Sequence, residues 1–152
     1  MSLSVGTVAP EFSLTSHDGQ KVNLSDYRGK KNVLVFFYPF AFTGTCTGEV
    51  CAVRDAMPAS SNPDTVILAI SCDPVYSLAV FAKQENVDYL LLSDFWPHGE
   101  VAKSYGVFLE ERGMATRGSF IIDKEGVIRW MVINGPGEAR DVTQYQEALA
   151  AL

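Results

Sequence analysis

The sequence predicts an α/β domain in which helices cover a mixed central sheet. Three observations point to this class: short, continuously apolar segments of strand length, segments of helical spacing that alternate with them, and a late hairpin followed by one last helix. Strands that alternate with helices favour parallel pairing, and a hairpin adds antiparallel strands. The chain of 152 residues contains no repeat or linker, so we expect a single domain over residues 1–152.

The N-terminal half supplies a hairpin and two buried strands. Residues 12–24 alternate apolar and polar positions around Asp18 and Gly19, a dipeptide that is typical of tight turns. Residues 32–38 and 65–72 are continuously apolar and rich in β-branched and aromatic side chains. This pattern is typical of strands that are buried on both faces of a sheet.

A helix is expected between these two strands. Val50, Val53 and Met57 recur at helical spacing, and the segment has no strand-like alternation. We therefore predict a helix over residues 44–57, which ends before Pro58 because proline cannot continue it.

The C-terminal half repeats the alternation and then closes the domain. Residues 77–86 form an amphipathic helical pattern, and residues 89–94 form a third apolar strand. Residues 119–133 are typical of a hairpin that turns at residues 123–126. Residues 141–152 predict the closing helix.

Composition and charge exclude several function classes. With 47% apolar and 11% aromatic residues the chain can bury a sizeable core. A net charge of -6 and a pI near 4.8 argue against nucleic acid or an anionic membrane as the main partner. We find no membrane-spanning run and no secretory signal, and three cysteines do not make a disulfide scaffold. We therefore expect a cytoplasmic protein.

The junction between the strand at residues 32–38 and the following helix carries the candidate chemistry. Active sites of α/β sheets lie where strands end and helices begin, and Cys46 falls in the first helical turn there. A thiol reacts as its thiolate, whereas a free cysteine with a pKa of about 8.5 is mostly protonated at neutral pH. The unpaired N–H groups and the dipole of the helix favour the anion. Thr43 offers a hydroxyl to the sulfur or to an oxygen substrate, and Pro39 fixes the chain.

A charged pair is expected beside Cys46. Glu49 follows one turn later, and a bare carboxylate there would disfavour the thiolate, so an arginine is needed nearby. Arg117 is the candidate because it directly precedes an apolar strand. The residues alone do not separate it from Arg54 or Arg112, and they leave open that Cys46 is a small core residue.

Pro39, Thr43 and Cys46 stand in the order P-x-x-x-T-x-x-C, which resembles the active-site signature of the peroxiredoxins, thiol peroxidases of the thioredoxin fold. The resemblance covers nearly the whole chain, since several further segments fall in the family's order: VGTVAPEFSL, SCDP, LLSDFWPHGEVAKSYGV and RGSFIIDKEGVIR. The segments FAFTGTC, SDFWPHG and GPGEARD most resemble the alkyl hydroperoxide reductase E type, a one-cysteine group.

The resemblance implies a role for each site residue. Cys46 would be the peroxidatic cysteine, whose thiolate attacks a peroxide and becomes a sulfenic acid. Thr43 would exchange hydrogen bonds with thiolate and peroxide, and Pro39 would shield the sulfenic acid. Arg117 would stabilise the thiolate and the breaking O–O bond, and Glu49 would orient Arg117. No metal or organic cofactor is implied.

Cys51 departs from the one-cysteine pattern. The spacing C-x-x-x-x-C resembles the peroxiredoxin Q group, in which the second cysteine resolves the sulfenic acid. Five residues of helix separate two Cα atoms by about 7.5 Å along the axis and by ~140° around it, whereas a disulfide requires ~4.4–6.8 Å. The first turns must therefore unwind, which Gly48 eases by about 1 kcal/mol relative to alanine. A packing role for Cys51 stays open, and Cys72 is a lesser candidate resolver.

The function predicted from the sequence is a thiol-dependent peroxidase for hydrogen peroxide, alkyl hydroperoxides or peroxynitrite. Its electrons would come from thioredoxin, a glutaredoxin-like protein or a low-molecular-weight thiol. A homodimer is expected, with Trp96 and Pro97 as one contact. The alternative is a redox-sensing or chaperone-like protein switched by Cys46 oxidation. A thioredoxin-like disulfide reductase is disfavoured because C-x-x-C is absent, and His17 and His98 lack zinc-like spacing.

Overall fold

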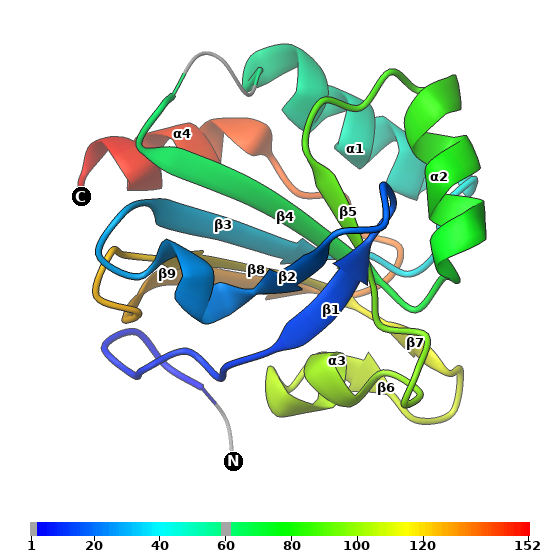
Figure 1. Ribbon diagram of the computed structural model, residues 1–152, viewed down its shortest axis with the longest axis horizontal. Helices are drawn as coiled ribbons and strands as arrows, with labels where there is room; N and C mark the ends of the chain where they lie inside the picture. The colour runs from blue at the N-terminus through cyan, green and yellow to red at the C-terminus, as the bar shows by residue number, and fades with distance from the viewer. Residues whose placement is uncertain (1–2, 59–61) are drawn as a thin grey trace.

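The computed structural model describes residues 3–58 and 62–152 (Figure 1). Every strand and helix expected from the sequence is present, with bounds that differ by a few residues. In chain order the elements are β1 (Ser13–Ser16), β2 (Lys21–Asn23), the 3-10 helix η1 (Leu24–Tyr27), β3 (Asn32–Phe37), α1 (Gly44–Ala56), β4 (Thr65–Ser71), α2 (Val75–Gln84), β5 (Leu90–Ser93), α3 (Glu100–Ser104), β6 (Phe108–Leu109), β7 (Met114–Ala115), β8 (Arg117–Ile122), β9 (Ile128–Asn134) and α4 (Val142–Ala150).

The central sheet is mixed, as predicted. Its strand order is β2-β1-β5-β4-β3-β8-β9. The pairs β3–β4 and β4–β5 are parallel, whereas β8 joins β3 and β9 in antiparallel pairs and β1 joins β2 and β5 in the same way. The two strands that the sequence marks as continuously apolar, β3 and β4, therefore lie at the centre of the sheet, where both faces are covered.

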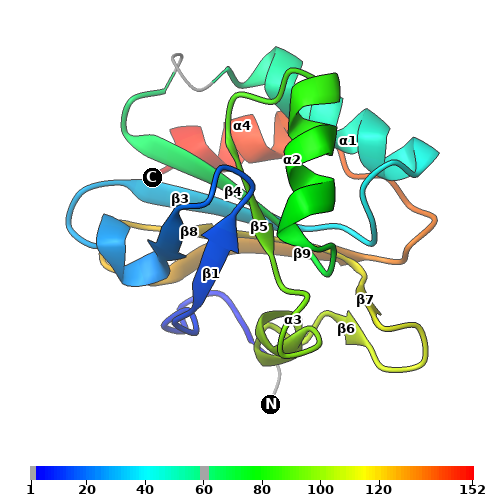
Figure 2. The same ribbon diagram turned by 45° about the vertical axis from the view of Figure 1, so that its right-hand side comes forward.

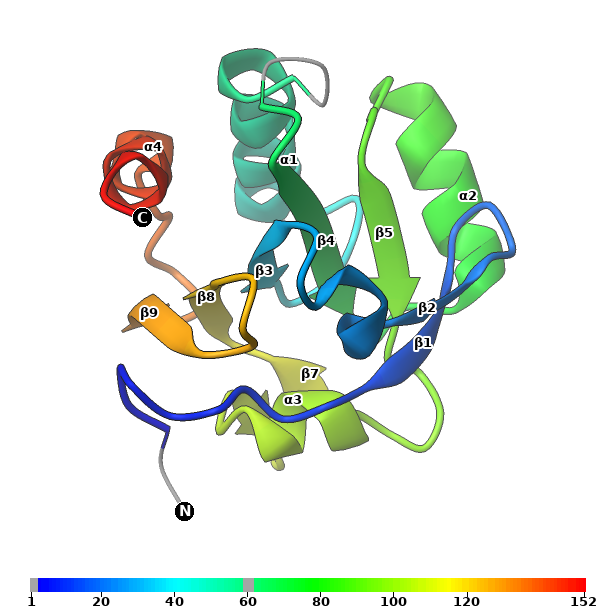
Figure 3. The ribbon, with the colours of Figure 1, turned by 60° about the vertical axis from the view of Figure 1, so that its left-hand side comes forward.

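Helices cover the two faces of this sheet unequally. Helices α1, α2 and α4 lie on one side, and the N-terminal segment and α3 lie on the other (Figures 2 and 3). The alternation of β3 sends Leu34 and Phe36 into the cluster formed with α1, α2 and α4, and sends Val35 and Phe37 into the opposite cluster. Each face of β3 thus contributes side chains to one hydrophobic layer, which explains its unbroken apolar sequence.

The segment between β5 and β8 holds elements that the sequence did not predict. Helix α3 and the small β6–β7 hairpin are short and carry no strong periodic pattern. The buried carboxylate of Asp94 starts α3 by accepting hydrogen bonds from the backbone N–H groups of Val101 at 3.2 Å and Ala102 at 2.8 Å. Asp94 lies 7 and 8 residues before the N–H groups that it binds, outside α3 itself, so helical propensity alone does not reveal the contact.

Candidate active site

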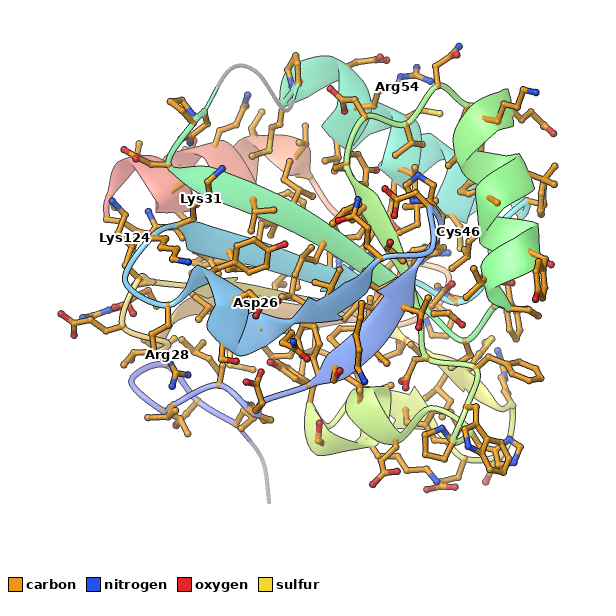
Figure 4. All side chains as sticks on the ribbon, viewed as in Figure 1. Asp26, Arg28, Lys31, Cys46, Arg54 and Lys124 are labelled. Atoms are coloured by element: carbon orange, nitrogen blue, oxygen red, sulfur yellow. The ribbon has the colours of Figure 1, made fainter. Side chains whose placement is uncertain are left out.

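The candidate site forms where β3 ends and α1 begins. Thr43 is the N-cap of α1, with the extended backbone angles φ -79° and ψ 151°. Phe42 just before it adopts φ 72°, a left-handed conformation that is uncommon for a residue with a side chain. The chain thus turns sharply and places Cys46 in the first turn of α1, where its side chain is fully buried (Figure 4).

A buried carboxylate from the neighbouring strand holds this turn. Asp73 follows β4, and its Oδ2 accepts hydrogen bonds from the Ala41 backbone N–H at 2.8 Å and from the Ser71 hydroxyl at 2.6 Å. The Ser93 hydroxyl donates to the Asp73 carbonyl oxygen at 2.6 Å. Asp73 lies in the segment SCDP that carries part of the family resemblance, but the sequence assigned it no role in positioning the loop.

Arg117 reaches Cys46 through the pairing of β8 with β3. The antiparallel register sets Phe36 opposite Ser119, so the beginning of β8 lies at the end of β3, where the Cys46 loop starts. The Arg117 Nη1 donates to the Cys46 Sγ at 3.4 Å and to the Glu49 Oε1 at 2.5 Å. Its Nε donates to the Pro136 carbonyl at 2.7 Å. The guanidinium is therefore fixed on three sides within a buried site.

A second arginine, Arg140, completes the site, and the sequence reasoning missed it. Its backbone N–H and its Nε donate to the Glu49 Oε2 at 2.6 and 2.9 Å, and its Nη2 donates to the Glu49 Oε1 at 2.9 Å. Its Nη1 donates at 2.9 Å to the Gly118 carbonyl and to the Ser119 hydroxyl. The sequence hinted at Arg140 through its place in the segment GPGEARD, but no local pattern joins Arg140 to Glu49, because 91 residues separate them.

Glu49 therefore lies between two guanidinium groups. Burial alone would raise the pKa of Glu49, but the hydrogen bonds and charge of Arg140, together with the charge of Arg117, outweigh burial and lower it. One carboxylate and two guanidinium groups carry one net positive charge. An anion at the Cys46 sulfur would balance that charge, and buried charges are tolerated when they are paired.

Thr43 and Pro39 lie in the loop that leads from β3 to Cys46. The Thr43 hydroxyl donates to the Phe40 carbonyl at 2.9 Å, and no hydrogen bond of the described residues joins it to Cys46. Because its proton is committed to that carbonyl, the Thr43 oxygen keeps its lone pairs to accept a proton donor such as a hydroperoxide. Pro39 is buried at the end of β3, directly before this turn.

The other two cysteines differ in environment. All three cysteines are free thiols, and α1 runs unbroken through Cys46 and Cys51. Cys51 is half-buried, and its Sγ donates to the Glu85 Oε1 at 3.3 Å. Burial, with the charges of Asp94 and Asp73, raises the pKa of Cys72 to about 12. Cys72 is therefore poorly suited to act as a thiolate at neutral pH.

Three exposed aromatic side chains lie in the loop before α1 and in the segment after β5. Phe42 and Phe95 are each 50% exposed, and Trp96 is 70% exposed. The Phe42 ring packs edge-on against Phe81 of α2, with ring centroids 5.1 Å apart. Among residues 3–58 and 62–152 we find no group of histidine, cysteine and carboxylate side chains arranged to hold a metal ion. No helix in these ranges is long and apolar enough to cross a membrane.

Comparison with known proteins places the chain among relatives of one family. The sequence pattern of the AhpC/TSA family matches residues 5–131. The chain is 48% identical to alkyl hydroperoxide reductase E of Mycobacterium tuberculosis over 150 residues, which cover 99% of this chain and 98% of that protein. It is 39% identical to peroxiredoxin Bcp of Escherichia coli over 132 residues, or 83% of each chain.

Solved structures give the same result. The crystal structure of reduced 2-Cys peroxiredoxin from Plasmodium vivax superimposes with a TM-score of 0.87 at 28% identity, covering 97% of this chain and 80% of that one. Peroxidoxin BcpB from Mycobacterium tuberculosis gives a TM-score of 0.82 at 32% identity, with 97% and 95% coverage. The resemblance and the thioredoxin fold predicted from the sequence are therefore confirmed, and the chain belongs to the AhpC/TSA family of peroxiredoxins.

Proposed function

We propose that the protein is a thiol-dependent peroxidase in which Cys46 is the peroxidatic cysteine. One observation carries the proposal: the buried Cys46 Sγ accepts a hydrogen bond at 3.4 Å from Arg117, whose guanidinium is held by Glu49. A fixed, desolvated cation beside a thiol favours the thiolate, which is the reactive form. A cysteine that served only to fill the core would need no such partner.

The chemical step follows from these groups. The Cys46 thiolate attacks the terminal oxygen of a hydroperoxide, so that an S–O bond forms while the O–O bond breaks. The electron pair of the O–O bond leaves on the second oxygen, which takes up a proton and departs as water or an alcohol. Cys46 is oxidised to a sulfenic acid, and the peroxide is reduced.

The neighbouring groups position the peroxide and stabilise the developing charge. Arg117 can hold the anionic sulfur and then the negative charge that spreads over the breaking O–O bond. Glu49 and Arg140 keep that guanidinium in place and do not touch the reacting atoms. The Thr43 oxygen can accept a hydrogen bond from the O–H group of the hydroperoxide, and Pro39 shields the sulfur from solvent.

We expect hydrogen peroxide, alkyl hydroperoxides and peroxynitrite as substrates. All three present a reactive O–O bond to the thiolate. Phe42 lies beside Thr43 with half of its surface exposed. Apolar surface at the mouth of the site gives an organic hydroperoxide more contact than hydrogen peroxide. The preference can be measured as the ratio of the two second-order rate constants.

Cys51 is the proposed resolving cysteine. A disulfide between Cys46 and Cys51 requires that the first turns of α1 unwind, because intact helix holds the two residues too far apart. The electrons that restore the thiols would come from thioredoxin, a glutaredoxin-like protein or a low-molecular-weight thiol. The reducing cytoplasm, where such thiols are maintained, is the location that we propose.

Turnover tests the proposed function. Purified protein with thioredoxin, its reductase and excess peroxide should consume many equivalents of peroxide per Cys46. A single stoichiometric burst under every reductant would instead identify a redox sensor or chaperone-like switch. Cys72→Ser is the matched control, because this thiol is buried and has a raised pKa, so its loss should leave the activity unchanged.

A further inference from the structure

The thiol of Cys51 is held by the end of a neighbouring helix. Cys51 lies on α1, and its Sγ donates to the Oε1 of Glu85, the C-cap residue of α2, at 3.3 Å. The other carboxylate oxygen of Glu85 accepts a hydrogen bond from the Gln84 side chain at 3.3 Å. Because the thiol is the donor, this contact exists only while Cys51 is protonated.

Two further contacts fix the same stretch of α1. The Arg54 guanidinium donates to the backbone carbonyl oxygen of Glu85. The buried Tyr89 hydroxyl donates to the Val50 carbonyl at 2.8 Å. The stretch of α1 around Cys51 is therefore tied to the end of α2 and to the start of β5. Arg54 and Cys46, both labelled in Figure 4, lie near opposite ends of α1. When α1 unwinds, the Cys46 end must move toward Cys51.

The charges that face Cys51 oppose its ionisation. Burial and the hydrogen bond to Glu85 raise the pKa of the Cys51 thiol, and the charges of Glu85 and Asp55 add to this effect. The charge of Arg54 acts in the opposite direction but does not cancel it. The nearby Tyr89 phenol is neutral, since burial raises its pKa well above the usual value. Glu85 is thus the group that both binds the thiol and disfavours the thiolate.

We infer that Glu85 is a positioning residue that holds Cys51 as a neutral thiol against α2 and thereby delays closure of the disulfide with Cys46. The inference rests on the proposed function, because it concerns the step after Cys46 oxidation. In that step the two sulfurs bond, the S–O bond of the sulfenic acid breaks, and the Cys51 proton leaves with the hydroxide as water. While Glu85 holds the thiol, the sulfenic acid stays open to an external thiol. At neutral pH the contact therefore slows internal resolution by Cys51, so that an external thiol can compete with Cys51 for the sulfenic acid.

The first experiment measures Cys51 alone. In a Cys46→Ser, Cys72→Ser background, the rate of iodoacetamide alkylation is followed against pH with and without Glu85→Gln. The amide keeps the size of the side chain but removes its charge. We expect Glu85→Gln to lower the midpoint of the alkylation–pH profile by about half to one pH unit, which raises the alkylation rate at neutral pH about three- to tenfold. Glu111→Gln, an exposed carboxylate ahead of β7, is the matched control and should leave the midpoint in place.

The second experiment measures the disulfide step in the otherwise unchanged protein. After one equivalent of peroxide, rapid acid quench and peptide mass mapping give the rates of sulfenic acid formation and of 46–51 disulfide formation. Glu85→Gln should leave the first rate unchanged and raise the second at neutral pH. If the alkylation midpoint and the disulfide rate both stay at the wild-type values, or if the disulfide rate falls, the inference is wrong. If wild-type Cys46 forms no sulfenic acid, the proposed function itself fails, so the two failures are distinguishable.

Discussion

At the scale of single residues, the site is built from a thiol, a carboxylate and two guanidinium groups that lie within one buried layer. Glu49 holds Arg117 from one side, and the Pro136 carbonyl holds it from another. Such a cation cannot reorient when a peroxide arrives, so it costs little reorganisation during the reaction. The immobility of Arg117 is as important as its charge.

The role of Arg117 is tested by Arg117→Ala and Arg117→Lys. Without the guanidinium the Cys46 sulfur loses its hydrogen-bond donor, and the breaking O–O bond loses its stabilising charge. We expect the second-order rate constant for peroxide to fall about 10²–10³-fold in Arg117→Ala. Lysine should restore only part of the rate, since it cannot bind the sulfur and Glu49 with the same planar geometry. Stopped-flow traces that match the wild type would reject the role.

Arg140 is expected to control how stability responds to acid. Its contacts lower the pKa of Glu49. A carboxylate with a lowered folded pKa contributes stability above its unfolded pKa of about 4.3, and this contribution is lost as the pH falls through the folded value. At pH 7 the free energy of unfolding of Arg140→Met should therefore be lower than that of the wild type by about 3–5 kcal/mol, the cost of removing one partner of a buried pair. The difference between the two proteins should become smaller in acid.

Urea unfolding at a series of pH values measures this effect. Arg129→Met is the matched control, because Arg129 pairs with Asp123 at the surface and its own side chain is 51% exposed. Such a pair contributes about 1 kcal/mol or less. A gap between the Arg140 variant and the wild type that stays constant from neutral pH to acid would contradict the assignment.

At the scale of elements, α1 must meet two structural requirements that conflict. Its first turn must hold Cys46 against Arg117 for peroxide attack, and the same turn must then unwind to bring Cys46 to Cys51. Gly48 lies between the two cysteines and is exposed, and a Cβ placed on it would meet no atom within 4 Å. The glycine is therefore not required by packing, and its effect on helix stability is the property to test.

Gly48→Ala should slow the disulfide step without changing peroxide attack. Alanine stabilises a helix interior by about 1 kcal/mol relative to glycine, which corresponds to about a fivefold lower population of the unwound form. Quenched-flow mass mapping of the 46–51 disulfide gives the rate directly, and the sulfenic acid rate in the same samples is the internal control. Equal disulfide rates in both proteins would mean that unwinding does not limit the step.

At the scale of the whole molecule, we propose that exposed aromatic side chains form the contact between two copies. Trp96 is 70% exposed and Tyr76 is 86% exposed, and both line one groove with Phe95 beside the β5 end of the sheet. Burying such side chains is favourable by about 1.5–3 kcal/mol each. We expect a homodimer by analytical ultracentrifugation and a shift toward monomer in Trp96→Ala. If the wild type is a monomer at every concentration tested, the homodimer is excluded.

The sequence predicted the longer strands and helices in their order, because these have strong periodic or apolar patterns, but it did not predict the short α3, β6 and β7. It also predicted that Cys46 and Glu49 would lie about one turn apart on the same helix. Physical reasoning from the residues did not separate Arg117 from Arg54 or Arg112, because the decision depends on the register of β8 against β3. The family resemblance was what singled out Arg117. Arg140 lies 91 residues from Glu49, and Asp73 lies 32 residues from Ala41. Such contacts depend on how distant segments meet, which no local pattern contains.

The most direct measurement is a single turnover of Cys46. Wild-type protein and Cys46→Ser are each mixed with one equivalent of hydrogen peroxide, and remaining peroxide and intact-protein mass are followed together. The account predicts that the wild type consumes the peroxide and gains one oxygen at Cys46, or forms the 46–51 disulfide, while Cys46→Ser does neither. Peroxide consumption by Cys46→Ser at the wild-type rate would contradict it.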